Sequence, residues 1–244
     1  MLKRLFGDTL TDLGNLEGDY RFSQLRSDIS QGILYMLILS VGTLTMLWVD
    51  AILFKDQPGL FRLMIMYRAG YVAITILCGM ILYRTTKVRV YDRLMFGWIL
   101  LTVLYRVLLY YTRPANYLTA PFDIIFLFAI YLLSPLRVQY TISLAALFSV
   151  GTLYTDYFLR SGVDPIPLSV MITTQFTAHM LGWISVLQMQ TYRRKSFQAF
   201  IDEKDAKEMV AYLANIDPLT KSLTRRQFLS IAESEFRRFQ RYHR

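Results

Sequence analysis

Six long apolar segments leave this chain few ways to fold. They cover residues 32–54, 63–83, 94–111, 118–134, 138–158 and 166–188. Each is about long enough to cross a hydrocarbon core of ~30 Å as a helix, and the short loops between them should make neighbouring helices antiparallel. Only 18% of the residues are charged, whereas about a quarter are charged in a soluble domain. We therefore expect an all-α, polytopic six-helix transmembrane bundle over residues 32–189.

The positive charges between these segments predict the orientation of the bundle. If the N-terminus is inside, the cytoplasmic side carries twelve of these Lys and Arg residues and the outer side carries four. The positive-inside rule favours this topology, with both termini in the cytoplasm. The loops also account for the net charge of +9, so we expect a lipid bilayer and no nucleic acid as partner. The inner set is Lys3, Arg4, Arg21, Arg26, Arg84, Lys87, Arg89, Arg93, Arg137, Arg193, Arg194 and Lys195, and the outer set is Lys55, Arg62, Arg113 and Arg160.

Residues 1–31 form a polar, cytoplasmic N-terminal segment before the first apolar run. No apolar run lies early enough for a cleaved signal peptide. Leu10, Leu13 and Leu16 recur at helical spacing, which fits a short helix lying on the inner leaflet. Three glycines weaken any long helix here, and a loosely ordered tail fits the pattern equally well.

A layer of ionisable residues lies inside the apolar segments. Counted from the segment ends at 1.5 Å per residue, its members lie within ~10 Å of the outer edge and come from five different segments. Charges in a membrane need a partner, water or the interior of the bundle. His179 alone lies deeper and is a candidate for a second polar site. The members of the layer are Asp50, Arg68, Arg106, Asp123 and Asp156.

Two interpretations of this layer stay open. It is either a self-neutralising ion-pair network that holds the bundle together, or a pocket that binds a small polar molecule from outside. Arg68 and Arg106 come from antiparallel neighbours at one depth, where two like charges are unfavourable unless an anion lies between them. The aspartates can supply that anion, and so can the carboxylate or phosphate of a ligand. The hypothesis is an anionic small-molecule ligand.

The connector over residues 190–216 shows a heptad pattern, which is typical of a coiled coil. We expect a parallel homodimer through this cytoplasmic signalling helix. A single amphipathic helix that packs on its own domain is the alternative. The pattern steps by 3 and 4 through Ala199, Asp202, Ala206, Met209, Leu213 and Ile216, of which the last four are the predicted dimer seam.

The stretch D-P-L-T-K-S-L-T-R-R at residues 217–226 predicts a break between two helices. Pro218 cannot continue a helix, so the connector helix should end at Asp217. Thr224 and Gln227 fit a capping box, and a new helix should begin at Arg225. Its apolar residues fall on one face at helical spacing: Phe228, Ile231, Ala232, Phe239 and Tyr242.

The same stretch resembles the opening of the GGDEF domain of bacterial diguanylate cyclases. In that family a D-x-L-T turn follows a signalling helix, and an R-R-x-F helix then opens the catalytic fold. Lys221 stands where the family usually has Gly, and Thr224 stands where it often has Asn. The resemblance implies that residues 217–244 begin an α/β GGDEF domain and that the chain lies in a bacterial inner membrane. The matching positions are Asp217, Pro218, Leu219, Thr220, Leu223, Arg225, Arg226, Phe228, Glu235 and Arg238.

By this resemblance, the parent protein condenses two GTP molecules into cyclic di-GMP with Mg²⁺, using two domains that face each other. The G-G-[DE]-E-F motif does not occur in these 244 residues. No phosphate-cradling glycine loop, nucleophile–base pair or metal-ligand spacing occurs either, so the chain alone should be catalytically silent. Two other classes are a membrane receptor or scaffold with a degenerate GGDEF domain, and a small transporter. The lack of broken helices and of an internal repeat argues against the transporter.

Overall fold

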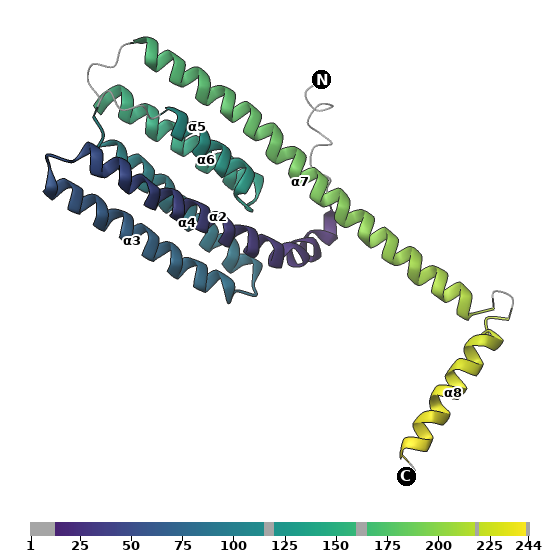
Figure 1. Cartoon of the computed structure of the whole chain (residues 1–244). Helices are drawn as coiled ribbons and strands as arrows, with labels where there is room; N and C mark the ends of the chain where they lie inside the picture. Colours follow the sequence, from purple (N-terminus) through teal and green to yellow (C-terminus); the bar gives the residue numbers. More distant parts are fainter. Residues whose placement is uncertain (1–12, 115–119, 160–164, 218–219, 243–244) are drawn as a thin grey trace, which may run out of the picture. The chain divides into compact units, whose positions relative to one another are not determined.

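Helices make up almost all of the chain that the structure describes. The structure is a computed structural model that describes residues 13–114, 120–159, 165–217 and 220–242 (Figure 1). Within these ranges no strand occurs, and Ile216 and Leu223 form an isolated β-bridge. The prediction of an all-α chain is therefore confirmed. Contacts divide the chain into two units, Met1–Thr191 and Tyr192–Arg244.

Each predicted apolar segment lies largely within one helix, except the fifth, which α6 and η2 share. By length and composition, α2, α3, α4 and α7 can cross a membrane. Helices α5 and α6 have 14 and 17 residues, fewer than the ~20 that a crossing usually takes. The chain is thus compatible with a membrane protein. In order, the elements are η1 (Gly14–Leu16), α2 (Glu17–Leu53), α3 (Pro58–Tyr83), α4 (Val88–Tyr110), α5 (Ala120–Leu133), α6 (Val138–Tyr154), the π-helical η2 (Thr155–Leu159), α7 (Pro165–Asn215) and α8 (Arg225–Tyr242).

Prolines and short connections determine several helix ends. Pro58 is the first residue of α3, where its missing N–H needs no partner. Pro135 lies just after α5, because proline cannot extend a helix. The connections 54–57, 84–87 and 134–137 each join two helices that pack against each other.

The first long helix begins earlier than predicted. α2 starts at Glu17 and continues unbroken into the first apolar segment, so residues 17–31 are part of one long helix. Leu25 and Ile29 are buried, and their burial offsets the weak helix propensity of Gly18 in the first turn. Leu10 lies outside the described residues.

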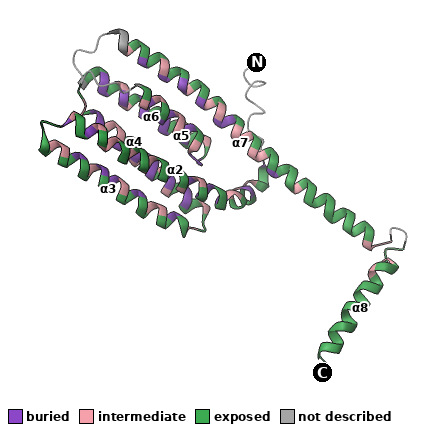
Figure 2. Cartoon of the chain, viewed as in Figure 1, coloured by how far each residue is buried: buried purple, intermediate pink, exposed green. Residues whose placement is uncertain are grey.

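The core of the first unit forms around α4. Met95 and Ile99 are fully buried and Trp98 is 2% exposed, and α4 contacts α2, α3 and α6. Figure 2 shows buried residues gathered where α2 to α6 face one another. The outward faces are exposed although they are apolar, as at Trp48 and Ile76. A wide apolar exterior is typical of helices that meet lipid.

The predicted connector is not a helix of its own. α7 continues from the sixth apolar segment through the heptad pattern and belongs to both units. It ends at Asn215, two residues before the predicted end at Asp217. The seam residues Met209 and Leu213 are more than half exposed, so the coiled-coil homodimer stays a prediction.

A tight loop separates α7 from α8. The Oδ1 atom of Asp217 accepts a hydrogen bond from the Thr220 N–H at 2.9 Å, and the Asp217 carbonyl accepts one from the Lys221 N–H at 2.9 Å. Lys221 has a φ of +57°, a left-handed conformation that favours glycine. Pro218 and Leu219 lie outside the described residues.

Helix α8 begins at Arg225, as predicted. The predicted capping box is wrong in one half, because the Thr224 N–H donates to the Asn215 carbonyl at 2.9 Å instead of to Gln227. The Thr224 hydroxyl donates to the Ala214 carbonyl at 3.3 Å and so satisfies one of the free carbonyls at the end of α7. The predicted apolar face is exposed, with Phe228 at 60%.

Candidate functional site: an ionic layer between the helices

Asp50 on α2 holds two arginines from other parts of the chain. Its Oδ2 lies 2.5 Å from Arg68 Nε on α3, and its Oδ1 lies 2.5 Å from Arg113 Nη2, just after α4. Arg68 also donates to the Thr43 carbonyl at 2.9 Å. Asp50 is fully buried and the side chains of Arg68 and Arg113 are 2% and 7% exposed. This is a buried, hydrogen-bonded charge cluster, in which removal of one member leaves its partners uncompensated.

Asp123 on α5 forms the second pair of the layer. Its Oδ1 lies 3.4 Å from Arg106 Nη2 on α4, and its Oδ2 accepts a hydrogen bond from the Tyr110 hydroxyl. The Arg106 guanidinium also lies over the Phe126 ring, 5.8 Å from its centroid. Asp156, in η2, is 5% exposed and close enough to act electrostatically on Asp123. The structure therefore assembles all five predicted layer residues in the bundle.

Arg113 is the member that the sequence analysis missed. It was assigned to an outer loop because it lies beyond the third apolar segment, but its side chain is buried against Asp50 and over the Phe54 ring. With it, the layer contains three acidic and three basic residues rather than three and two. These Arg–Asp pairs are what we expect if the layer is a self-neutralising ion-pair network.

Two small cavities adjoin the layer. One of about 160 Å³ lies among α2, α3, α4 and α5 and is lined by Arg68, Arg106, Tyr71, Tyr105 and apolar side chains. Tyr105 stacks on Tyr71 with centroids 4.3 Å apart. A second, of about 20 Å³, touches Arg68, Arg106 and Arg113. Typical ligand pockets have 300–1,000 Å³, so the larger cavity lies below the usual size of a ligand pocket.

His179 lies apart from this layer and joins α7 to its neighbours. Its Nδ1 is 2.8 Å from the Tyr131 hydroxyl on α5, and its Nε2 is 2.7 Å from Ser149 Oγ on α6. One turn earlier, Gln175 donates to Thr152 Oγ1 on α6 at 3.1 Å. Both ring nitrogens are engaged by protein groups, so His179 is a link between helices rather than a ligand site. No metal-type cluster of His, Cys, Asp or Glu occurs in the described ranges.

A second ionic cluster, absent from the sequence analysis, lies where α2 begins. Arg21 pairs with Asp92 at the start of α4 and lies 4.0 Å from Asp28, and Arg137 Nε is 3.4 Å from Asp92 Oδ2. The cluster ties α2 to α4 and to the α5–α6 connection. The signal in the sequence was the presence of two aspartates, Asp28 and Asp92, among the arginines that were predicted to lie on the cytoplasmic side. The search for polar residues stopped at the limits of the apolar segments and so overlooked them.

Known proteins offer no guide to this layer. Comparison of the chain with protein-family models, curated proteins and solved structures finds no match.

Proposed function

We propose that the chain is the membrane sensory and dimerising region of a diguanylate cyclase, with a GGDEF domain that begins at Asp217. The observation that supports this most is the loop after α7. The Asp217 carboxylate closes this loop by accepting a hydrogen bond from the Thr220 N–H. Lys221 has a positive φ at the position where the family usually has glycine. A helix with an R-R-x-F start follows at once, in the order that the resemblance predicts.

In this proposal the first unit crosses the membrane six times, and both termini are cytoplasmic. The π-helical η2 extends α6, and together they have a length close to the ~20 residues of a crossing helix. α5 is the shortest crossing, and its acidic residue is neutralised by Arg106. The ionic layer then lies near the outer face. Direct Arg–Asp pairs support a structural role for this layer, and an anionic ligand stays a prediction.

No group of His, Cys, Asp or Glu that could hold a metal ion occurs among the described residues of the second unit. The acidic residues of α8, Glu233 and Glu235, are exposed and lie 3.6 Å and 3.4 Å from Arg237 and Arg238. Mg²⁺ needs several oxygen ligands in one place, and these side chains do not gather. In the proposed parent, the nucleotide and metal therefore bind to other parts of the GGDEF domain.

The topology predicts which loops a membrane-impermeant maleimide can reach. In a Cys78→Ser background, a cysteine at Gln57 should be labelled from outside, because it lies in the α2–α3 connection. Cysteines at Lys87 and Ser196 should react only after the membrane is permeabilised. Labelling of Lys87 from outside would reverse the orientation. Asn116 and Gly162, outside the described residues, serve as two further outer positions.

The function is tested by a chimera in which a complete, active GGDEF domain follows Ile216 in frame. With GTP and Mg²⁺, this chimera should make cyclic di-GMP, because the seam brings two domains together. Met209→Glu with Leu213→Glu places charges in the seam and should lower the rate of synthesis at least about tenfold, which corresponds to ~1.4 kcal/mol of lost association.

Ala211→Glu with Ala214→Glu is the matched control, because both positions lie away from the seam. This variant should retain the activity of the parent chimera. Equal activity of all three chimeras would contradict dimerisation through the seam. An inactive parent chimera of correct mass would favour a receptor or scaffold instead.

A further inference from the structure

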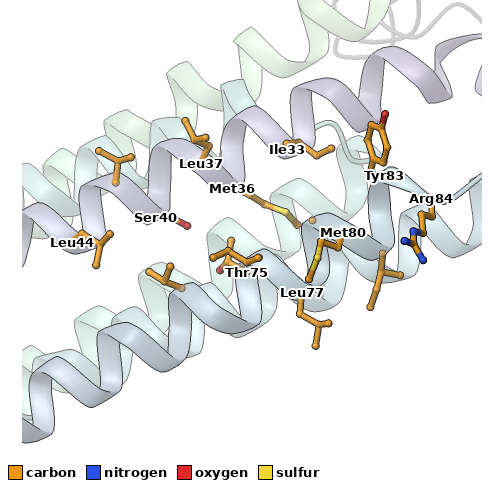
Figure 3. A pocket seen from close by; sticks show the side chains of 15 residues that line it. Ile33, Met36, Leu37, Ser40, Leu44, Thr75, Leu77, Met80, Tyr83 and Arg84 are labelled. Atoms are coloured by element: carbon orange, nitrogen blue, oxygen red, sulfur yellow. The ribbon is translucent and has the colours of Figure 1, made fainter.

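A groove between α2 and α3 lies on the outside of the first unit, separate from the ionic layer. Its volume of about 860 Å³ is near the upper end of the range of ~300–1,000 Å³ for pockets that bind small molecules. Figure 3 shows Met36 and Ser40 of α2 facing Thr75 and Met80 of α3 across it. Its walls are almost wholly apolar. The groove persists because small residues, including Ser40, leave space between two helices that otherwise pack closely.

The groove has the length of one leaflet of a bilayer. On α3 its lining extends from Val72 to Arg84, which is about 18 Å at 1.5 Å per residue. On α2 it extends from Ile33 to Leu44, or about 16 Å by the same rise. Half of a hydrocarbon core of ~30 Å is about 15 Å. An acyl chain that enters at one membrane surface would therefore follow the groove to its end.

One end of the groove is positively charged. Arg84 lines this end and is exposed, and within the described ranges it has no ion pair. Lys87 in the same connection and Arg89 in the first turn of α4 are also exposed. The nearest aspartate in the sequence, Asp92, is already engaged by two arginines. Basic residues at a membrane surface attract anionic headgroups, and the guanidinium fork matches a phosphate.

We propose that this groove binds one anionic phospholipid, with an acyl chain along α2 and α3 and the phosphate at Arg84. The proposal goes beyond the cyclase function and does not rest on it, since it requires only that α2 and α3 lie in a bilayer. A second copy of the chain is the other candidate occupant. Its apolar helix face would leave Arg84 without an anion, whereas a phospholipid fills the apolar groove and neutralises the charge.

The test is native mass spectrometry of the delipidated chain, titrated with phosphatidylglycerol or phosphatidylcholine. The parent should retain one phosphatidylglycerol, with a Kd about fivefold lower than for phosphatidylcholine, because one basic residue contributes ~1 kcal/mol to such binding. Arg84→Gln should remove this preference, because the net negative charge of phosphatidylglycerol then has no cation at the end of the groove. Arg62→Gln is the matched control, because Arg62 is exposed near the opposite end of α3.

Gly79→Leu tests the apolar part of the site. A Cβ at Gly79 would lie 3.8 Å from Met36 Sδ, an ordinary contact, so the leucine can enter the groove without a clash at its first atom. Binding of both lipids should fall, while the thermal unfolding temperature stays at or above that of the parent. Equal Kd values for the two lipids in the parent would overturn the proposal. So would the same loss in Arg62→Gln as in Arg84→Gln, or a dimer that retains no lipid.

Discussion

Asp50→Ala is expected to lower the free energy of unfolding by about 3–5 kcal/mol, the usual effect of leaving a buried charge without its partner. The effect is large because Asp50 neutralises two arginines, whose side chains are only 2% and 7% exposed. Both would lose a hydrogen-bonded carboxylate in a region where water does not replace it. Unfolding by sodium dodecyl sulfate in mixed micelles, followed by tryptophan fluorescence, measures the change.

Asp56→Ala is the matched control for this substitution. Asp56 lies in the α2–α3 connection, six residues after Asp50, and is exposed, so its loss should change the free energy of unfolding by less than about 0.5 kcal/mol. The double variant Asp50→Ala with Arg113→Met should recover part of the loss, since one fewer cation is left unpaired. Equal unfolding of the Asp50 and Asp56 variants would show that the ion pairs add nothing to stability.

Gly182→Ala should also destabilise the first unit, by about 1–3 kcal/mol, the typical effect of overpacking. A Cβ at Gly182 on α7 would overlap the ring of Tyr131 on α5. The ring would have to move, and its hydroxyl lies 2.8 Å from His179 Nδ1. One methyl group would therefore disturb both the packing of α7 and the hydrogen bonds that attach it. Hydrogen exchange of the α7 amides should become faster near His179, and the unfolding measurement above gives the magnitude.

Gly97→Ala is the control, and its expected effect on the free energy of unfolding has the opposite sign. Gly97 lies within α4, and an added Cβ there meets nothing within 4 Å. Alanine is the better helix former by roughly 1 kcal/mol, so this variant should be as stable as the parent or more stable. The prediction for Gly182 fails if both alanine variants are stabilising. A Tyr131→Leu partner substitution should relieve the overlap, so the effects at Gly182 and Tyr131 should be non-additive.

The depth of a residue, counted along its apolar segment, predicted five members of the ionic layer but not which of them pair. Asp50, Arg68, Arg106, Asp123 and Asp156 were predicted to share one depth, and the structure brings them together in the bundle. The partners within the layer could not be predicted in this way, since a depth does not say which helices are adjacent. Asp50 pairs with Arg68 and with Arg113, 18 and 63 residues further along the chain.

The connections between elements were harder to predict than the elements themselves. The start of α8 at Arg225 was correct, because the proline and the apolar spacing are local signals. One half of the capping box at Thr224 was wrong, because the Thr224 N–H donates to the carbonyl of Asn215, nine residues earlier. The start of α2 was wrong for a related reason. A polar, glycine-containing stretch stays helical when tertiary packing buries residues such as Leu25 and Ile29.

By itself, the sequence determined the helical class, the positions of the apolar helices, the presence of charges within them and the break before Arg225. These features depend on periodicity, hydropathy and proline chemistry, which act over a few neighbouring residues. Only the tertiary structure decided that Arg113 completes the layer, that His179 links α7 to α5 and α6, and that α2 and α3 leave a groove ending at Arg84. The physical reason is that pairing and cavities depend on which helix faces lie next to each other, and side chains far apart in the sequence determine that.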